Sequence, residues 1–114
     1  MAMSNPLSDA MVELIAERFR TIGEPTRIRI LERLRDGEAS VQELADHVGS
    51  SQQNVSKHLG LLARSGIVGR RKDGTFVHYR ITDESVLAMC EQVCGAVARD
   101  VASLAAALEG SRGR

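Results

Sequence analysis

Residues 50–80 read SSQQNVSKHLGLLARSGIVGRRKDGTFVHYR, and this stretch decides the fold. Its first half has apolar residues at helical spacing, namely Val55, Leu59 and Leu62. Such spacing predicts an amphipathic helix with one buried face. Either Ser50 or Ser51 can cap the helix, because a serine hydroxyl accepts a hydrogen bond from a free backbone N–H of the first turn.

The second half of the stretch changes period after Gly66. Residues prone to β-structure occupy 67–71 and 75–81, and Lys72-Asp73-Gly74 lies between them. Asp-Gly between two such segments is a strong signal for a β-hairpin. The stretch therefore predicts a helix followed by a hairpin.

Charge is distributed unevenly along the chain, although the formal net charge is zero. Residues 50–80 contain six basic residues and one acidic residue, Asp73, which gives this stretch a formal charge of +5. The remainder therefore carries −5. A local basic field on a neutral protein suits binding to phosphates.

Three further helices are predicted before this stretch. The first begins at Ser8 or Asp9 and ends at Gly23, and its inward positions are Met11, Leu14, Ile15, Phe19 and Ile22. The second opens at Glu24-Pro25-Thr26 and stops at Asp36-Gly37, with Ile28, Leu31 and Leu34 as its inner stripe and Ile30 beside them. The third starts at Ser40, where Glu43 completes a capping box, and its inward residues are Val41, Leu44, Ala45 and Val48.

A long final helix is predicted from a cap at Asp83 to about Leu108. The fold class is therefore mainly α with a small β-hairpin (α+β), with elements in the order α-α-α-α-β-β-α. The 114 residues suit one domain over 8–108, between a flexible segment at 1–7 and a flexible tail at 109–114. Aromatic residues are few, so Leu, Ile, Val and Ala must build the core.

Two short helices joined by a tight turn, followed by a basic hairpin, form a winged helix-turn-helix. The second of the two helices enters the major groove of DNA and presents its first turns to base edges. Glutamine can pair with adenine, and basic hairpin residues can contact the phosphate backbone. The predicted DNA contacts are Ser51, Gln52, Gln53, Ser56, Lys57, His58, Arg70, Arg71 and Lys72. His58, next to Leu59, is equally well explained as a residue at the edge of the core.

Several segments resemble the ArsR/SmtB family of bacterial winged-helix repressors. They are Gly23-Glu24-Pro25-Thr26-Arg27, Val41-Gln42-Glu43-Leu44-Ala45, residues 51–59 and the hairpin from Arg70 to Tyr79. The resemblance covers about residues 10–100. It implies a homodimer formed through the first and last helices, which binds a double-stranded operator with imperfect two-fold symmetry. It also implies that Ser-Gln-x-x-Val-Ser is the recognition segment, and that a metal ion or an oxidant can release the DNA.

The metal sites of the family are not matched. Ser40 and Gln42 stand where a thiolate site would need cysteines. Asp83 is retained from a second site, but its partner positions hold Ser85, Ala96 and Arg99, and lack imidazoles. We therefore predict no metal at either site and no cofactor.

Cys90 and Cys94 are the only cysteines, and they lie four residues apart in the last helix. Three interpretations stay open. They can be small apolar packing residues, redox-sensing thiols, or ligands of a thiophilic metal or metalloid. Cys90 lies two turns inside the predicted helix, away from the N-terminus where the helix dipole would activate a catalytic thiol.

The leading hypothesis is a DNA-binding repressor that is not an enzyme. The alternatives are a thiol-based metal-trafficking or redox protein, and a winged helix that binds another protein. No apolar run approaches a membrane span and no secretory signal is evident, so we expect a cytoplasmic protein that joins the nucleoid when bound to DNA.

Overall fold

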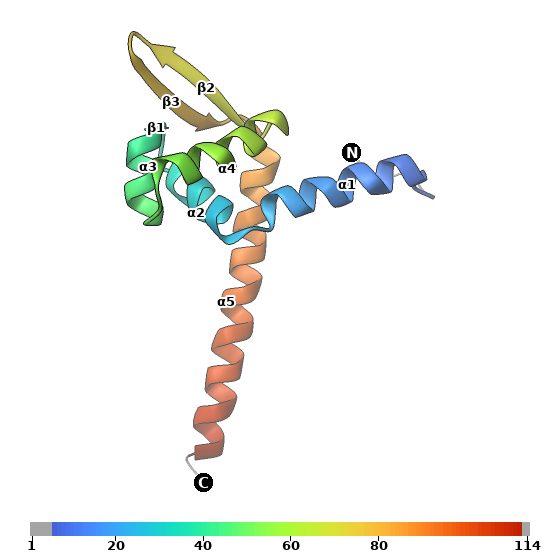
Figure 1. Cartoon of the computed structure of the whole chain (residues 1–114). Coiled ribbons are helices and arrows are strands. Elements are labelled where there is room, and N and C mark those ends of the chain that lie inside the picture. The colour runs from blue at the N-terminus through green and yellow to red at the C-terminus, as the bar shows by residue number, and fades with distance from the viewer. Residues whose placement is uncertain (1–5, 113–114) are drawn as a thin grey trace. The chain divides into compact units, whose positions relative to one another are not determined.

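A computed structural model describes residues 6–112 (Figure 1). The chain forms two compact units, Met1–Asp83 and Glu84–Arg114. The last predicted helix forms the second unit, and the single domain predicted over 8–108 spans both units. Of the segment predicted to be flexible at 1–7, residues 1–5 lie outside the described residues, as do residues 113–114 of the predicted tail.

The first unit contains four helices: α1 (Asp9–Ile22), α2 (Pro25–Leu34), α3 (Val41–Val48) and α4 (Gln52–Arg64). Their boundaries follow from local chemistry. Ser8 caps α1 and Gly23 ends it, and the Glu24 side chain accepts a hydrogen bond from the Arg27 N–H at the start of α2. The predicted capping box of Ser40 and Glu43 is present at the start of α3. The predicted helix boundaries in this unit are therefore confirmed to within a residue or two.

A three-stranded antiparallel sheet completes the unit, with strand order β1-β3-β2. The predicted hairpin is confirmed as β2 (Val68–Asp73) and β3 (Phe76–Ile81). Strand β2 ends two residues later than predicted and β3 begins one residue later, because Asp73 pairs with Phe76 and the connection consists of Gly74 and Thr75. Gly74 has φ 63°, a left-handed conformation that favours glycine.

The two-residue strand β1 (Ala39–Ser40) was not predicted. Ala39 pairs with Tyr79, and Ser40 pairs with His78. The segment that leads into α3 runs beside β3 and pairs with it. The strand is therefore defined by pairing with residues distant in the sequence and not by local β-propensity.

The core of the first unit consists of aliphatic side chains, as the composition predicted. The largest fully buried side chains are Ile30, Leu44, Val55, Leu59, Leu62 and Ile67. The predicted inner stripe of α2 was wrong at one position, because Ile28 is exposed whereas Ile30, Leu31 and Leu34 are buried. Helix α2 contacts α3, α4 and β3, and this range of neighbours buries a different face from the one that spacing alone favoured.

The second unit is the helix α5 (Glu84–Arg112). Its start agrees with the predicted cap position at Asp83. Its end lies four residues beyond the predicted end at Leu108, so residues 109–112 are helical rather than a tail. No helix within residues 6–112 combines the length and apolar character needed to cross a bilayer.

Candidate nucleic-acid interface

A tight turn joins α3 to α4 and forms a helix-turn-helix. Gly49 has φ 70° and ends α3, where its N–H and that of Ser50 both donate to the Ala45 carbonyl oxygen. The next helix starts at once, because the Ser51 hydroxyl accepts a hydrogen bond from the Asn54 N–H at 3.1 Å. The Asn54 side-chain amide also donates to the Ser50 hydroxyl at 2.8 Å. This second hydrogen bond, which also stabilises the turn, was not predicted from the sequence.

The inner face of α4 fixes the direction in which its outer face points. Val55, Leu59 and Leu62 are all fully buried, as predicted. Because an α-helix has 3.6 residues per turn, the side chains on the opposite side of α4 from these anchors face outward. The exposed residues at the start of α4 are Ser51, Gln52, Gln53, Ser56 and Lys57. These five predicted contact residues therefore share one accessible polar surface.

His58 does not belong to that surface. Its side chain is only 12% exposed. Arg27 Nε donates to His58 Nδ1 at 3.1 Å, and Glu24 Oε2 lies 3.6 Å from the same nitrogen. The Arg27 guanidinium also donates to the Thr21 carbonyl oxygen at 2.8 Å, at the end of α1. His58 therefore connects α4 to the junction of α1 and α2, which agrees with the prediction of a residue at the edge of the core.

The hairpin presents its basic residues on two different faces. Side chains alternate along a strand, so Arg70 and Lys72 point to one face of the sheet and Arg71 points to the other. All three residues are exposed. Arg70 lies opposite Tyr79 and Lys72 lies opposite Val77, whereas Arg71 lies opposite His78. The three predicted wing contacts thus separate into a pair and a single residue.

Arg71 already has an intramolecular partner. Its Nε and Nη2 atoms donate to the two carboxylate oxygens of Glu38, at 3.1 Å and 2.7 Å. This hydrogen bonding lowers the pKa of the Glu38 carboxyl and raises the pKa of Arg71, since each charge favours the ionised form of the other. Glu38 was not recognised in the sequence, because it lies 33 residues from its partner.

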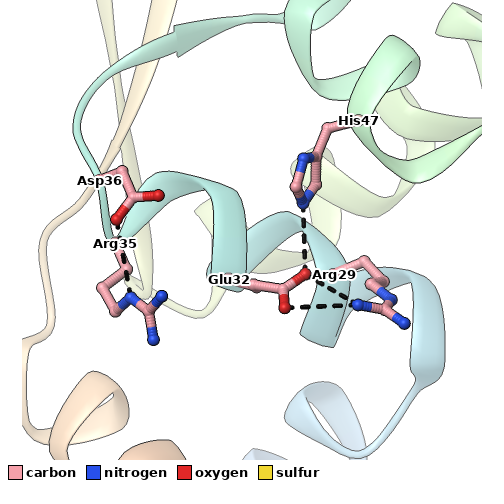
Figure 2. A network of polar contacts seen from close by, with 5 residues as sticks. All are labelled: Arg29, Glu32, Arg35, Asp36 and His47. Carbon is pink, nitrogen blue, oxygen red and sulfur yellow. Dashed lines mark hydrogen bonds and ion pairs between the residues drawn. The ribbon is translucent and has the colours of Figure 1, made fainter.

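A second polar network supports the helix-turn-helix from α2. Figure 2 shows Glu32 between Arg29 and His47, with Arg35 and Asp36 near the end of the helix. Glu32 accepts from Arg29 Nη1 at 3.0 Å and lies 3.2 Å from His47 Nε2. Hydrogen bonds from these two residues lower the pKa of the Glu32 carboxyl. Because His47 is near the end of α3, the contact joins α2 to the helix that precedes the turn.

The two cysteines of α5 are free thiols. Cys90 is half-buried and Cys94 is exposed. Burial raises the pKa of the Cys90 thiol, which lowers the fraction of the reactive thiolate form at this position. Within residues 6–112, no three His, Cys, Asp or Glu residues are grouped as a metal site would require.

Residues 22–71 match a family model described as a helix-turn-helix domain. The chain is 43% identical over 82 residues to the HTH-type transcriptional regulator KmtR of Mycobacterium tuberculosis, a match that covers 72% of this chain and 63% of the relative. It is also 37% identical over 106 residues to Rv0081, an uncharacterised HTH-type transcriptional regulator of the same organism. That match covers 92% of this chain and 93% of the relative.

The structure of this chain also resembles solved structures of related proteins. The crystal structure of Rv0081 superposes with a TM-score of 0.77 at 36% identity, covering 84% of this chain and 97% of that one. Mb0332 of Mycobacterium bovis, a homodimeric winged helix-turn-helix DNA-binding domain and possible ArsR-family regulator, gives a TM-score of 0.74 at 28% identity, covering 89% and 94%. The sequence matches and the observed helix-turn-helix with its wing point to the same family. The chain belongs to the ArsR/SmtB family of DNA-binding transcriptional regulators.

Proposed function

We propose that this chain is a repressor that acts by binding, without catalysis, as a homodimer on a near-palindromic operator in the bacterial cytoplasm. The observation that carries the proposal is the outer face of α4. Its exposed residues are polar or basic, while its inner face is fully buried, so this face is both rigidly positioned and free to meet a partner. A rigid, polar helix face is what reading of base edges in the major groove requires.

The proposed contacts divide by chemistry. Gln52 and Gln53, in the first turn of α4, can form paired hydrogen bonds with adenine, and Ser56 can bond to several bases. Lys57 suits a phosphate or a guanine edge. Arg70 and Lys72 share one face of the wing and suit the flanking phosphates. Ser51, His58 and Arg71 are left out of this set because their side chains hold intramolecular partners.

The proposed dimer rests on apolar surface within each unit. On α1, Met11, Leu14 and Phe19 are exposed although their spacing predicted an inward face. On α5, exposed apolar residues recur at intervals of three or four: Val93, Val97, Val101, Leu104 and Leu108. Such stripes favour burial against another helix. A two-fold dimer would place its two α4 helices roughly 34 Å apart, one turn of DNA.

The direct test begins with recovering a duplex from a randomised library with the wild-type protein. Fluorescence anisotropy then measures affinity for this duplex and for a shuffled duplex at several salt concentrations. Base reading predicts that the Gln53→Ala/Ser56→Ala variant loses affinity mainly for the recovered duplex. Equal losses on both duplexes would contradict base reading, and binding that does not respond to salt would contradict DNA binding itself.

Regulation through Cys90 and Cys94 is the second part of the proposal. The two thiols are one helical turn apart, and Cys94 is open to reagents. Two subunits could together supply enough thiolates for a thiophilic metal or for reversible oxidation. The test compares operator affinity of the wild type and the Cys90→Ser/Cys94→Ser variant, with and without Hg²⁺ or hydrogen peroxide. Identical responses would reduce the thiols to packing residues.

A further inference from the structure

The contact between Arg71 and Glu38 joins two parts of the DNA-binding unit. Glu38 directly precedes β1, the strand that leads into α3. Arg71 lies in β2, on the far side of the sheet, because the strand order is β1-β3-β2. Ser40, His78 and Arg71 occupy one row across the three strands. The Arg71 side chain therefore reaches across β3 to the entrance of the helix-turn-helix.

The contact is bidentate, and it adds to the contacts that β2 and β3 make with the helices of the unit. At the base of the hairpin, the Thr82 hydroxyl donates to the Gly66 carbonyl oxygen at 3.0 Å, and the Thr82 N–H donates to the Ile67 carbonyl oxygen at 2.9 Å. Beyond the base, β1 pairs with β3 at only two positions. An arginine fork on a carboxylate fixes direction as well as distance. It is thus suited to hold the outer part of the hairpin in one orientation.

We propose that Glu38 and Arg71 form a tether that sets the orientation of the wing relative to α3 and α4. Arg71 is then a positioning residue for operator recognition, and the phosphate contacts of the wing come from Arg70 and Lys72 on the opposite face. This inference rests on the proposed DNA-binding role of the wing. The opposing view makes Arg71 a phosphate contact that Glu38 neutralises until DNA arrives.

The two views predict different effects of Glu38→Gln. The tether predicts that Glu38→Gln and Arg71→Gln change recognition in the same direction, although they change the net charge in opposite directions. Each should lower the ratio of affinities for the recovered duplex and the shuffled duplex about two- to fivefold, the range of an exposed ion pair. The charge-swapped variant Glu38→Arg/Arg71→Glu should restore the ratio.

Salt dependence supplies a matched control. Arg70→Gln removes the same charge as Arg71→Gln, from the neighbouring residue on the other face of β2. We expect Arg70→Gln to flatten the slope of log affinity against log salt by about 0.9, as the loss of one phosphate contact does. Arg71→Gln should leave the slope unchanged. A flattened slope in Arg71→Gln, with tighter binding of both duplexes by Glu38→Gln, would overturn the tether.

Hydrogen exchange in the full-length protein without DNA tests the tether separately from DNA binding. Backbone amides of residues 70–73 and 76–78 should exchange several-fold faster in both Glu38→Gln and Arg71→Gln. They should return to the wild-type rate in the charge-swapped variant and stay at that rate in Arg70→Gln. Unchanged exchange in both single variants would overturn the tether, whereas failure of wild-type DNA binding would overturn the proposed function alone.

Discussion

Helices α1 and α4 are both half-exposed helices of the first unit, yet their outer faces differ in chemistry. The exposed side of α4 carries glutamine, serine and lysine. The exposed side of α1 carries large apolar groups, and Leu14 and Phe19 are 67% and 57% exposed. A polar outer face suits water and the edges of DNA bases, whereas exposed leucine and phenylalanine side chains are unfavourable in water and gain stability when another surface covers them. The difference supports the proposed roles of α4 in DNA binding and of α1 in the dimer.

The largest effect is expected from the inner face of α4, which holds its outer face in place. Leu59→Ala removes a fully buried side chain and should lower the free energy of unfolding by about 2–5 kcal/mol. Lys57→Ala, two residues away on the outer face, should change it by less than about 0.5 kcal/mol. Urea unfolding at fixed protein concentration measures both. Similar losses would mean that the two faces of α4 are not distinct.

Equal charges placed on the two outer faces should separate their partners. Leu14→Glu should weaken the dimer by about 1.5–3 kcal/mol, the value of one buried leucine side chain. Gln52→Glu should leave the dimer intact and weaken binding to DNA, because it sets a carboxylate near the phosphates. Sedimentation equilibrium and anisotropy report the two effects. An unchanged dimer dissociation constant in Leu14→Glu would contradict the assignment of α1 to the dimer interface.

The N-caps of the two helices allow a finer comparison. The hydroxyl groups of Ser8 and Ser51 both accept a hydrogen bond from a first-turn N–H, at 3.1 Å in each case. Replacing either serine with alanine should cost about 1 kcal/mol of unfolding free energy. Only Ser51→Ala should also reduce operator affinity, since only its helix carries the proposed base contacts. A comparable reduction in Ser8→Ala would assign α1 a role in DNA binding.

The smallest effect concerns single surface charges. Lys57→Gln on α4 should flatten the salt slope of DNA binding by about 0.9. Arg20→Gln on α1 removes the same charge from a residue that is paired with Glu17 at 2.9 Å, and should leave the slope unchanged. Titrations of one duplex at four salt concentrations would resolve the difference. Equal slopes for the two variants would place Lys57 outside the contact surface.

Much of this arrangement is predictable from local sequence. Serine caps and the capping box at α3 act within a few residues, so their effects were found at the expected positions. The hairpin was found as predicted, with its turn at Gly74 and Thr75 instead of 72–74. The inner face of α4 followed from spacing, because this helix buries a narrow apolar stripe. The prediction of which α4 residues are exposed followed from that stripe alone.

The features that were missed depend on contacts between distant residues. Strand β1 needs its pairing with β3, and the burial of Ile30 instead of Ile28 depends on which neighbours surround α2. Arg71 looked identical to Arg70 in the sequence, and only alternation along β2 and the position of Glu38 distinguish them. Side chains in a candidate site can thus be identified from sequence before their partners are known.

The open edge of the sheet has a consequence for the free protein. Strand β2 lies at the end of the strand order, so its outer backbone groups have no neighbouring strand among the described residues. An open edge can pair with the edge of another molecule and start aggregation. The cationic side chains of Arg70 and Lys72, which lie on β2, disfavour approach of a second copy of the same edge. We therefore expect the charge on the wing to oppose edge-to-edge pairing between copies of the free protein.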